Sequence, residues 1–367
     1  MRITRVLVVL MCAILFGCDG KQDGVSDAVN KVSLYADNEV IKADGSYSAK
    51  LTVIYTDDQG VKHDVTSESD IYYDGSDMPL ATPEFKTTEE ATYEFYAIYG
   101  FDISNTVSVR AVKGIPALPA DEEPGNSSFK HRMLLLQHTG NECPNCPKMM
   151  TILKKIAQDD TYNTFYNHVA SHSYNESDVA YSAAAGEISK NMNIRTYPML
   201  SYNLTQETDY MESEIKTRIL ELHKEMAEVG LAVSATHVGG VNGKGGSVYA
   251  SVSLKSAVSA NYRVAVWLLE DRIHSPQSGA DASWQNTHDN CLRFMCGNEK
   301  IERIYGKPIG TVEAGETHEL LVAIDLENSW IASNCKLMVI AADAAGRYDL
   351  LNCVVCPVGG SISYDYI

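Results

Sequence analysis

The first third of the chain alternates apolar and polar positions over short stretches separated by turns. Residues 50–55 (KLTVIY) and 92–97 (TYEFYA) each have the period of a strand with one buried face, and residues 57–60 (DDQG) are typical of a tight turn. Such regularly spaced strands predict an antiparallel β-sandwich over residues 31–112. Residues 113–129 lack apolar periodicity and contain three prolines, so we predict a semi-rigid linker there.

The pattern changes after residue 130 to alternating strand and helix signals. Residues 132–136 (RMLLL) contain a continuous apolar run that is typical of a strand buried on both faces, and apolar side chains then recur at helical spacing over residues 147–158. The further predicted elements are a strand at 165–171 and helices at about 178–192 and 210–227. This alternation predicts a three-layer α/β domain over residues 130–228.

Strand patterns return in the last part of the chain. The predicted strands cover residues 248–254, 262–269, 318–324, 336–342 and 349–355. They favour a second antiparallel β-domain, a sandwich or jelly roll, over residues 229–367. The predicted fold class is therefore multidomain, with an N-terminal β-sandwich, a central α/β domain and a C-terminal antiparallel β-sandwich. The order of turns and strands in residues 31–112 resembles bacterial immunoglobulin-like envelope modules.

The N-terminus has the pattern of an export signal. Two arginines precede an apolar run at residues 6–16 that is too short to span a bilayer. The run ends in LFGC (residues 15–18), which resembles the lipobox of bacterial lipoproteins. This resemblance implies a signal peptide over residues 1–17, acylation of Cys18 as the first mature residue, and a lipidated tether over residues 18–30. An ordinary signal peptide that happens to contain a cysteine is the alternative.

Charge limits the partners of the chain. It has 48 acidic against 30 basic residues, a net charge of −18, and residues 19–129 alone hold 21 acidic and 8 basic side chains. An acidic surface of this kind excludes nucleic-acid binding through the overall field. The expected partners are the outer membrane, through the N-terminal lipid, and envelope or surface proteins.

The motif with the clearest chemical potential is the CxxC at Cys143-Pro144-Asn145-Cys146. Cys143 directly precedes a predicted helix, where unsatisfied N–H groups and the positive end of the helix dipole favour thiolate over thiol. Cys146, one turn later, is placed to resolve a mixed disulfide formed at Cys143. The spacing therefore indicates a redox-active pair.

Strand, CxxC and helix, followed later by residues 194–198 (IRTYP), resemble the thioredoxin superfamily. The resemblance implies a thioredoxin-like central domain and a cis Tyr197–Pro198 bond that packs against the disulfide. The chain also departs from the pattern. Glu142 stands where thioredoxins have tryptophan, Gln137 stands where they bury an acid, and a full β-hairpin after Pro198 is hard to find.

Two functions fit these residues. The first is a membrane-anchored thiol–disulfide oxidoreductase, with Cys143 as nucleophile, Cys146 as resolving cysteine and Pro198 shaping the site. The second is a non-catalytic surface or adhesion protein in which the CxxC is a structural disulfide. The accessibility of Cys143 separates them, since an exposed pair favours the enzyme and a buried pair favours the binding protein.

The other cysteines lie in the C-terminal part, with C-x4-C and C-x2-C spacing. They are Cys291, Cys296, Cys335, Cys353 and Cys356. In an exported chain the two spaced pairs are expected to form structural disulfides rather than to bind zinc, with Cys335 as the odd member. No cofactor or metal ion is predicted. His168 and His172 would share one face of a strand, where structural histidines are the commoner outcome.

The whole architecture resembles one known family, the Bacteroidetes lipoproteins related to the twenty-eight-kilodalton outer-membrane protein. The motifs that carry the resemblance are LLxxTGxxCxxCP from Leu135, WLLED from Trp267, HDN from His288 and DLLN from Asp349. It covers residues 130–355. It implies an outer-membrane, lipid-anchored protein on the periplasmic or cell-surface side, and it implies no particular activity.

Overall fold

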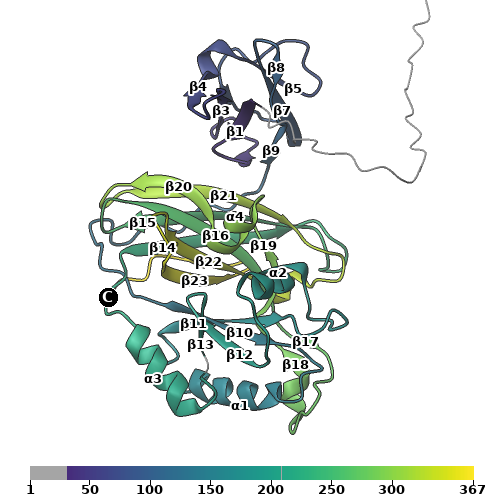
Figure 1. Ribbon diagram of the computed structural model, residues 1–367, viewed down its shortest axis with the longest axis vertical. Coiled ribbons are helices and arrows are strands. Elements are labelled where there is room, and N and C mark those ends of the chain that lie inside the picture. Colours follow the sequence, from purple (N-terminus) through teal and green to yellow (C-terminus); the bar gives the residue numbers. More distant parts are fainter. Residues whose placement is uncertain (1–30, 208) are drawn as a thin grey trace, which may run out of the picture.

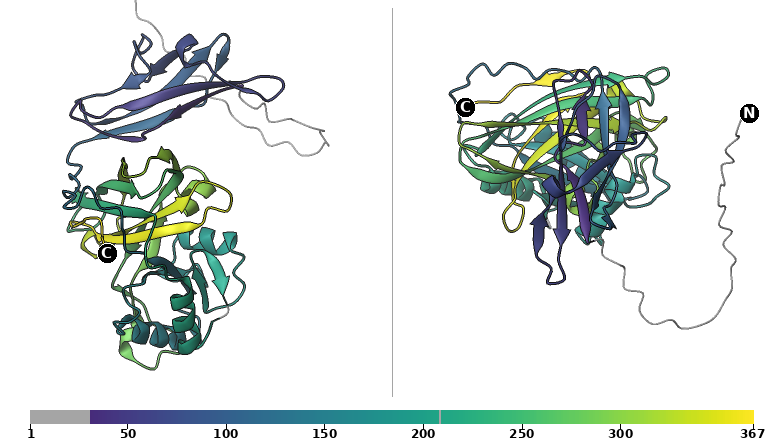
Figure 2. Two further views of the ribbon diagram at one scale, coloured as in Figure 1. Left: turned by 90° about the vertical axis from the view of Figure 1, so that its left-hand side faces the viewer. Right: turned by 90° about the horizontal axis from the view of Figure 1, so that it is seen from above.

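The computed structural model describes residues 31–207 and 209–367, which form a β-rich molecule in three parts (Figures 1 and 2). In Figure 1 the N-terminal strands lie at one end, the C-terminal strands lie in the middle, and α1 (Cys146–Ala157) and α3 (Glu212–Leu222) lie at the other end. The predicted signal peptide, Cys18 and the tether fall outside the described residues. Within those residues, no helix is long and apolar enough to cross a membrane.

Residues 32–112 form two sheets that enclose one apolar core. The strands are β1 (Val32–Ala36), β2 (Val40–Lys42), β3 (Ala49–Thr56), β4 (Lys62–Asp64), β5 (Asp70–Tyr73), β6 (Glu84–Phe85), β7 (Ala91–Tyr99), β8 (Asp102–Ile103) and β9 (Val107–Val112). One sheet has the order β1-β3-β4 with β6 beside β3, and the other has the order β2-β9-β7-β5 with β8 beside β7. Leu51 and Val53 of β3 are fully buried between the sheets, whereas Lys50 is exposed, so the alternating pattern predicted the inward face correctly.

Residues 133–222 alternate strands and helices in the predicted order. The elements are β10 (Met133–Thr139), α1, β11 (Tyr166–His172), α2 (Ala183–Asn191), β12 (Met199–Tyr202), β13 (Thr205–Glu207) and α3. β10 pairs in parallel with β11 and antiparallel with β12, and β12 pairs with β13. The hairpin that the sequence did not reveal is therefore present, and β13 is too short to give a periodic signal. α3 ends at Leu222 rather than near residue 227, because the backbone turns to an extended conformation at His223, and Ala227 further on bridges to Phe129.

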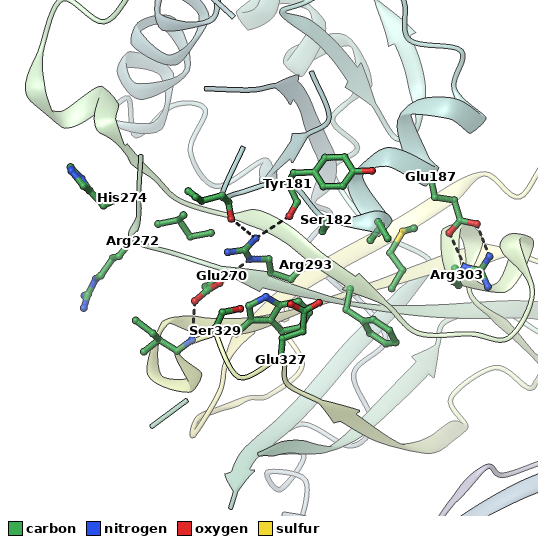
Figure 3. Close-up of a pocket in the computed structure, with 18 residues that line it drawn as sticks. Tyr181, Ser182, Glu187, Glu270, Arg272, His274, Arg293, Arg303, Glu327 and Ser329 are labelled. Carbon is green, nitrogen blue, oxygen red and sulfur yellow. Dashed lines mark hydrogen bonds and ion pairs between the residues drawn. The ribbon is translucent and has the colours of Figure 1, made fainter. Parts of the chain in front are cut away.

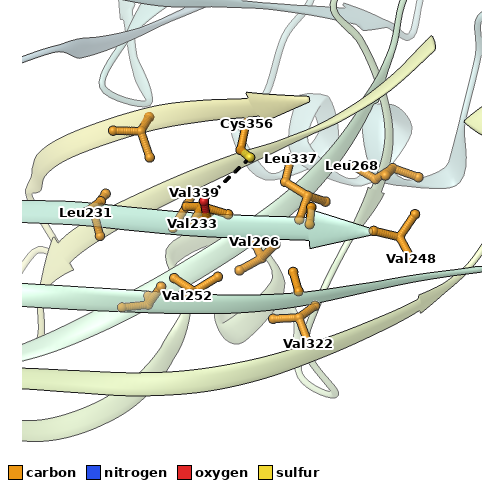
Figure 4. Packing of buried hydrophobic residues seen from close by; sticks show 14 of the residues in the cluster. Leu231, Val233, Val248, Val252, Val266, Leu268, Val322, Leu337, Val339 and Cys356 are labelled. Atoms are coloured by element: carbon orange, nitrogen blue, oxygen red, sulfur yellow. Dashed lines mark hydrogen bonds between the residues drawn. The ribbon is translucent and has the colours of Figure 1, made fainter. Parts of the chain in front are cut away.

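Most of the C-terminal part consists of long antiparallel strands. The elements are β14 (Val229–Val238), β15 (Ser247–Ser256), β16 (Ala260–Glu270), β17 (Ile273–His274), β18 (Thr287–His288), β19 (Cys291–Met295), α4 (Lys300–Tyr305), β20 (Lys307–Val312), β21 (Thr317–Asp325), β22 (Cys335–Asp343), β23 (Leu350–Pro357) and β24 (Ser361–Ile362). One sheet has the order β21-β15-β14-β24. It faces β16, β22 and β23 across a core that includes Val233, Val252, Val266 and Val339 (Figure 4).

The central and C-terminal parts share one nine-stranded sheet. Its order is β13-β12-β10-β11-β19-β16-β22-β23, with β20 beside β16. The two halves join where Ala170 of β11 lies parallel to Cys291 of β19, and the Ala170 N–H donates to the Asn290 carbonyl at 2.9 Å. The predicted boundary between residues 228 and 229 therefore falls inside one continuous body.

Strand alternation decides which face of this sheet each side chain reaches. On β10, Met133 and Leu135 pack with α1 and α3, whereas Leu134 packs with α2. Gln137 continues the first series and His138 continues the second. The polar end of β10 therefore sends Gln137 toward α1 and His138 toward α2.

The linker packs against the C-terminal part. Lys255 of β15 is 1% exposed. Its ammonium group donates to Asp121 Oδ2 and to the Pro124 carbonyl, each at 2.8 Å, and to the Tyr366 hydroxyl at 3.0 Å. Since a buried ammonium needs all its donors paired, these bonds fix the course of the linker.

The N-terminal part contacts the same region through polar groups. Arg110 Nη1 donates to Asp325 Oδ1 at 2.9 Å, and Lys307 Nζ donates to Glu39 Oε1 at 3.0 Å. Both pairs are at least one-quarter exposed, so each contributes little free energy on its own.

Replacing Lys255 is expected to destabilise the chain. The variant Lys255→Met removes the donor to Asp121 Oδ2 and to the Pro124 carbonyl and the buried ion pair with Asp121, which should lower the free energy of unfolding by about 2 kcal/mol. Equilibrium urea unfolding measures this, with Lys244→Met, a change at an exposed lysine, as the control. Equal stability of the two variants would contradict the role assigned to Lys255.

Candidate functional site

The CxxC lies where β10 ends and α1 begins. Cys143 and Cys146 form a disulfide with their Cα atoms 5.4 Å apart, and the Cys146 N–H donates to the Cys143 carbonyl at 3.2 Å. Pro147 follows in the first turn of α1, where its missing N–H removes no helical bond. Cys143 is 1% exposed and Cys146 is fully buried, whereas Pro144 and Asn145 between them are exposed. The dipeptide therefore reaches solvent while the sulfur atoms do not.

Residues 275–288, which we term the cap, cover the CxxC loop from the C-terminal part. Gln277 Nε2 donates to the carbonyls of Cys143 at 3.0 Å and Gly140 at 3.2 Å. The Ser278 N–H donates to the Asn141 carbonyl at 2.6 Å. In Figure 1, β18 at the end of the cap lies near α1. Three carbonyls of the loop that carries Cys143 are thus bound by the cap.

The rest of the cap is anchored on α1. Gln285 is fully buried, and its Nε2 donates to the Pro147 carbonyl at 3.0 Å and to Thr151 Oγ1 at 3.2 Å. Gly279 has φ +72°, and a Cβ there would lie 2.4 Å from the Pro144 carbonyl oxygen. Only glycine allows so close an approach of the two backbones.

Pro198 lies on a separate groove beside the disulfide. The Tyr197–Pro198 bond is cis, as predicted. The groove has a volume of about 290 Å³ and is lined by Asn145, Lys148, Met149, Ile152, Tyr197, Pro198 and Tyr210. The structure thus brings Pro198 and the CxxC dipeptide to one surface.

Two buried histidines and an aspartate hold the loop before Cys143. His172 Nδ1 lies 2.7 Å from Asp178 Oδ2, and the ring of His288 packs edge-on against that of His172 with centroids 4.7 Å apart. Burial alone would raise the pKa of Asp178, but hydrogen bonds from His172 and from the N–H groups of Ala180 and Asn141 lower it to about 2. The ionised carboxylate therefore accepts the Asn141 N–H, at 2.7 Å, and fixes the loop. Among the described residues, no three metal-ligating side chains converge.

The five C-terminal cysteines are free thiols, contrary to the predicted disulfides. Cys353 and Cys356 lie three residues apart on β23, so they point to opposite faces and enter different cores. Cys291 opens β19 and Cys296 follows its end, again an odd number of residues apart. Burial raises the pKa of Cys353 and Cys356 to about 11, and that of Cys296 and Cys335 to about 12, so these thiols stay protonated.

A wide cleft of about 900 Å³ opens beside α2 (Figure 3). Arg293 of β19 donates from Nε to Glu270 Oε2 at 2.8 Å and from Nη1 to the Val179 carbonyl at 3.0 Å. Arg303 of α4 donates from Nε to Glu187 of α2 at 2.7 Å. Since each of these arginines is paired with a glutamate of the same chain, the cleft is explained by the network that ties α2 to β19 and α4.

The Cys143–Cys146 pair and the cis bond at Pro198 are as the sequence predicts, whereas no sequence pattern predicts the cap. Gln277 and Gln285 are isolated glutamines in a polar loop, and no pattern marks them. The sequence marks His288 only as part of the HDN motif. His168 and His172 do share one face of β11, as expected, and they line a common cavity.

Comparisons with known proteins give a likeness of fold only. No protein-family model matches the chain, and no curated protein matches its sequence. Among solved structures, it is similar to HBP35 of Porphyromonas gingivalis, with a TM-score of 0.50 and 15% identity over 64% of this chain and 77% of that one. A β-glucuronidase of Bacteroides uniformis also aligns, at a TM-score of 0.22 and 12% identity over 37% of this chain and 13% of that one. That second likeness carries no argument, whereas the first shows a common fold over most of the described residues.

Loosening the cap is expected to expose the disulfide. The double variant Gln277→Ala/Gln285→Ala removes two hydrogen-bonding side chains worth about 1 kcal/mol each. The population of molecules whose cap has moved off the disulfide should therefore increase, and the rate of reduction by dithiothreitol should rise roughly tenfold or more. Alkylation and mass spectrometry of the Cys143–Cys146 peptide measure this rate. Gln59→Ala/Gln158→Ala, at exposed sites, is the matched control. Equal rates in both double variants would show that the cap does not limit access.

The buried histidines make stability depend on pH. His138 is fully buried between Ser189 and Ser201, and burial lowers its pKa to about 3. The unfolded chain binds this proton near pH 6.5 and the folded chain does not, so stability is complete above pH 6.5 and falls as the pH is lowered toward 3.

From this group alone, the free energy of unfolding should drop by about 2 kcal/mol between pH 7 and pH 5. Urea unfolding at both pH values should show that drop reduced by the same amount in His138→Asn. It should be unchanged in His274→Asn, an exposed histidine. An undiminished drop in His138→Asn would contradict the assignment.

Proposed function

We propose that this protein is an exported, lipid-anchored binding protein in which Cys143–Cys146 is a structural disulfide of a thioredoxin-like domain. The observation that carries the proposal is the burial of Cys143 under the cap. Thiol–disulfide exchange needs a thiolate to attack an accessible sulfur along the S–S axis. A sulfur at 1% exposure, under a cap bound to three loop carbonyls, does not offer that access.

The domain assignment rests on strand order. A parallel β10–β11 pair, an antiparallel β12 directly after a cis proline, and α1 directly after the CxxC loop support a thioredoxin-like unit. The two facing sheets of residues 32–112 support an immunoglobulin-like module. Gln137 replaces the buried acid of thioredoxins, so the position that would accept a proton from the resolving cysteine is neutral.

Location follows from the N-terminal motif. We assign Cys18 as the acylated residue and the outer membrane as the site of anchoring, in line with the lipobox and the family resemblance. β1 lies in the part of the molecule opposite α1 (Figure 1), so a lipid before it would hold the CxxC end away from the membrane. The surface available to envelope partners or ligands is then the α1 end.

One observation favours the oxidoreductase as a second candidate. The groove that Pro198 and Asn145 share borders the disulfide loop, and a partner protein could reach it from solvent. If the cap moves aside, Cys143 would be the nucleophile and Cys146 the resolving thiol.

The reduction potential of Cys143–Cys146 separates the two functions. For a structural disulfide we expect a value below about −300 mV in dithiothreitol redox buffers, and no exchange with a protein substrate. A value between about −120 and −270 mV, with exchange that is lost in Cys143→Ser, would instead establish the oxidoreductase. The cap variant Gln277→Ala/Gln285→Ala, measured in parallel, shows how much of the value is due to the cap.

A further inference from the structure

A second cavity, of about 490 Å³, lies between α1, the paired strands β10 and β11, and the cap. Its volume is in the range of pockets that hold small organic ligands. Six of its lining residues matter here: Gln137, Thr139, His168, Met150, Leu153 and Trp284. The cavity exists because two parts of the chain meet, since the first five come from residues 137–168 and the last from the cap.

One wall is polar where a core would be apolar. Gln137 and Thr139 follow Met133 and Leu135 on the same face of β10, and the first two are each 3% exposed. Gln137 Nε2, Thr139 Oγ1 and His168 Nε2 are buried and have no hydrogen-bond partner within the described part of the chain. A buried polar atom without a partner costs about 1–3 kcal/mol, so three of them on one cavity wall indicate that the cavity contents supply the partners.

The polar wall offers hydrogen-bond donors. Asn290 Nδ2 lies 3.2 Å from His168 Nδ1, so Nδ1 accepts and the proton of the neutral ring is on Nε2. Burial lowers the pKa of His168 to about 4, which keeps the ring neutral at pH 7. Gln137 Nε2 is also a donor, and the Thr139 hydroxyl can donate. The matching ligand group is therefore an oxygen acceptor.

A cation at the rim of the cavity favours an anionic acceptor. Lys154 Nζ lies 3.9 Å from the centre of the Trp284 ring, at the rim of the cavity. Asp289 of the lining accepts the Arg272 N–H at 2.9 Å. Asp271, whose charge acts on His168, is paired with Lys336 at 2.7 Å. Both aspartates therefore already have hydrogen-bond partners and do not compete with a ligand carboxylate for Gln137 and His168.

α1 contributes the apolar side chains Met150 and Leu153 to the lining, and the cap contributes the aromatic ring of Trp284 beside the polar Thr287 and His288. We propose that this cavity binds a small amphipathic carboxylate, whose oxygens accept hydrogen bonds from Gln137 and His168 and whose apolar body packs between α1 and Trp284. The site deepens the proposed function, on which it rests, by naming the class of ligand. Water alone would satisfy the polar wall but would leave the apolar lining in contact with solvent.

The test compares two probes that share an apolar phenylbutyl group and carry end groups of opposite charge. Saturation-transfer NMR on the mature chain should detect binding of 4-phenylbutyrate and no binding of 4-phenylbutylamine. Gln137→Met and Thr139→Val remove the unpaired groups with little change in shape, so both variants should fold at least as stably as the parent. Gln137→Met should weaken 4-phenylbutyrate binding at least tenfold, whereas Thr236→Val on β14, remote from the cavity, should leave it unchanged.

Equal binding of both probes, no binding of 4-phenylbutyrate, or full binding to a folded Gln137→Met variant would each overturn the proposal. These failures are distinct from failure of the proposed function. A disulfide that exchanges readily overturns that function whatever the cavity binds, and an unreactive disulfide with an empty cavity overturns the ligand site alone.

Discussion

Burial of β16 on both faces is the constraint on which the rest of the structure depends. Trp267 and Leu269 face α2 and α4, and Val266 and Leu268 face the second sheet across the core of Figure 4. Each such side chain stabilises the fold by about 2 kcal/mol only if its own face is covered. The C-terminal strands cannot cover both faces, because α2 comes from the central part. Residues 130–367 must therefore fold as one body around the shared sheet.

The position of the cap follows from that sheet. β16 and β19 are antiparallel neighbours, and the chain between Glu270 and Cys291 leaves their ladder beside Ala170 of β11, which pairs with Cys291. A buried ion pair between Arg293 Nε and Glu270 Oε2, at 2.8 Å, links the two strands where this segment leaves and rejoins the sheet. Since β19 lies beside β11, the cap starts close to the central part, and its Gln277 and Ser278 bind the loop that carries Cys143. Coverage of the disulfide is thus a result of strand order rather than of the CxxC motif.

The sequence predicts what depends on neighbours along the chain. Strand and helix positions and the CxxC pair follow from local spacing, and the cis bond at Pro198 is what the resemblance of the CxxC and IRTYP motifs to thioredoxins implies. It does not predict what depends on contacts between distant segments. Gln277 meets Cys143 only because β11 and β19 pair, and nothing local distinguishes it from any loop glutamine. The free cysteines are an intermediate case, because strand alternation alone shows that Cys353 and Cys356 cannot face each other.

The short span of the disulfide fits a local role. A cross-link that closes so few residues removes only about 2 kcal/mol of loop entropy from the unfolded chain, so it contributes modestly to global stability. Its larger effect is to hold the Cys143 carbonyl in place, where Gln277 binds it. That bond in turn positions the cap, whose Trp284 and His288 form part of the second cavity. The disulfide, the cap and the cavity are therefore structurally coupled, because the buried cross-link holds the loop that positions the cap, and the cap forms part of the proposed binding site.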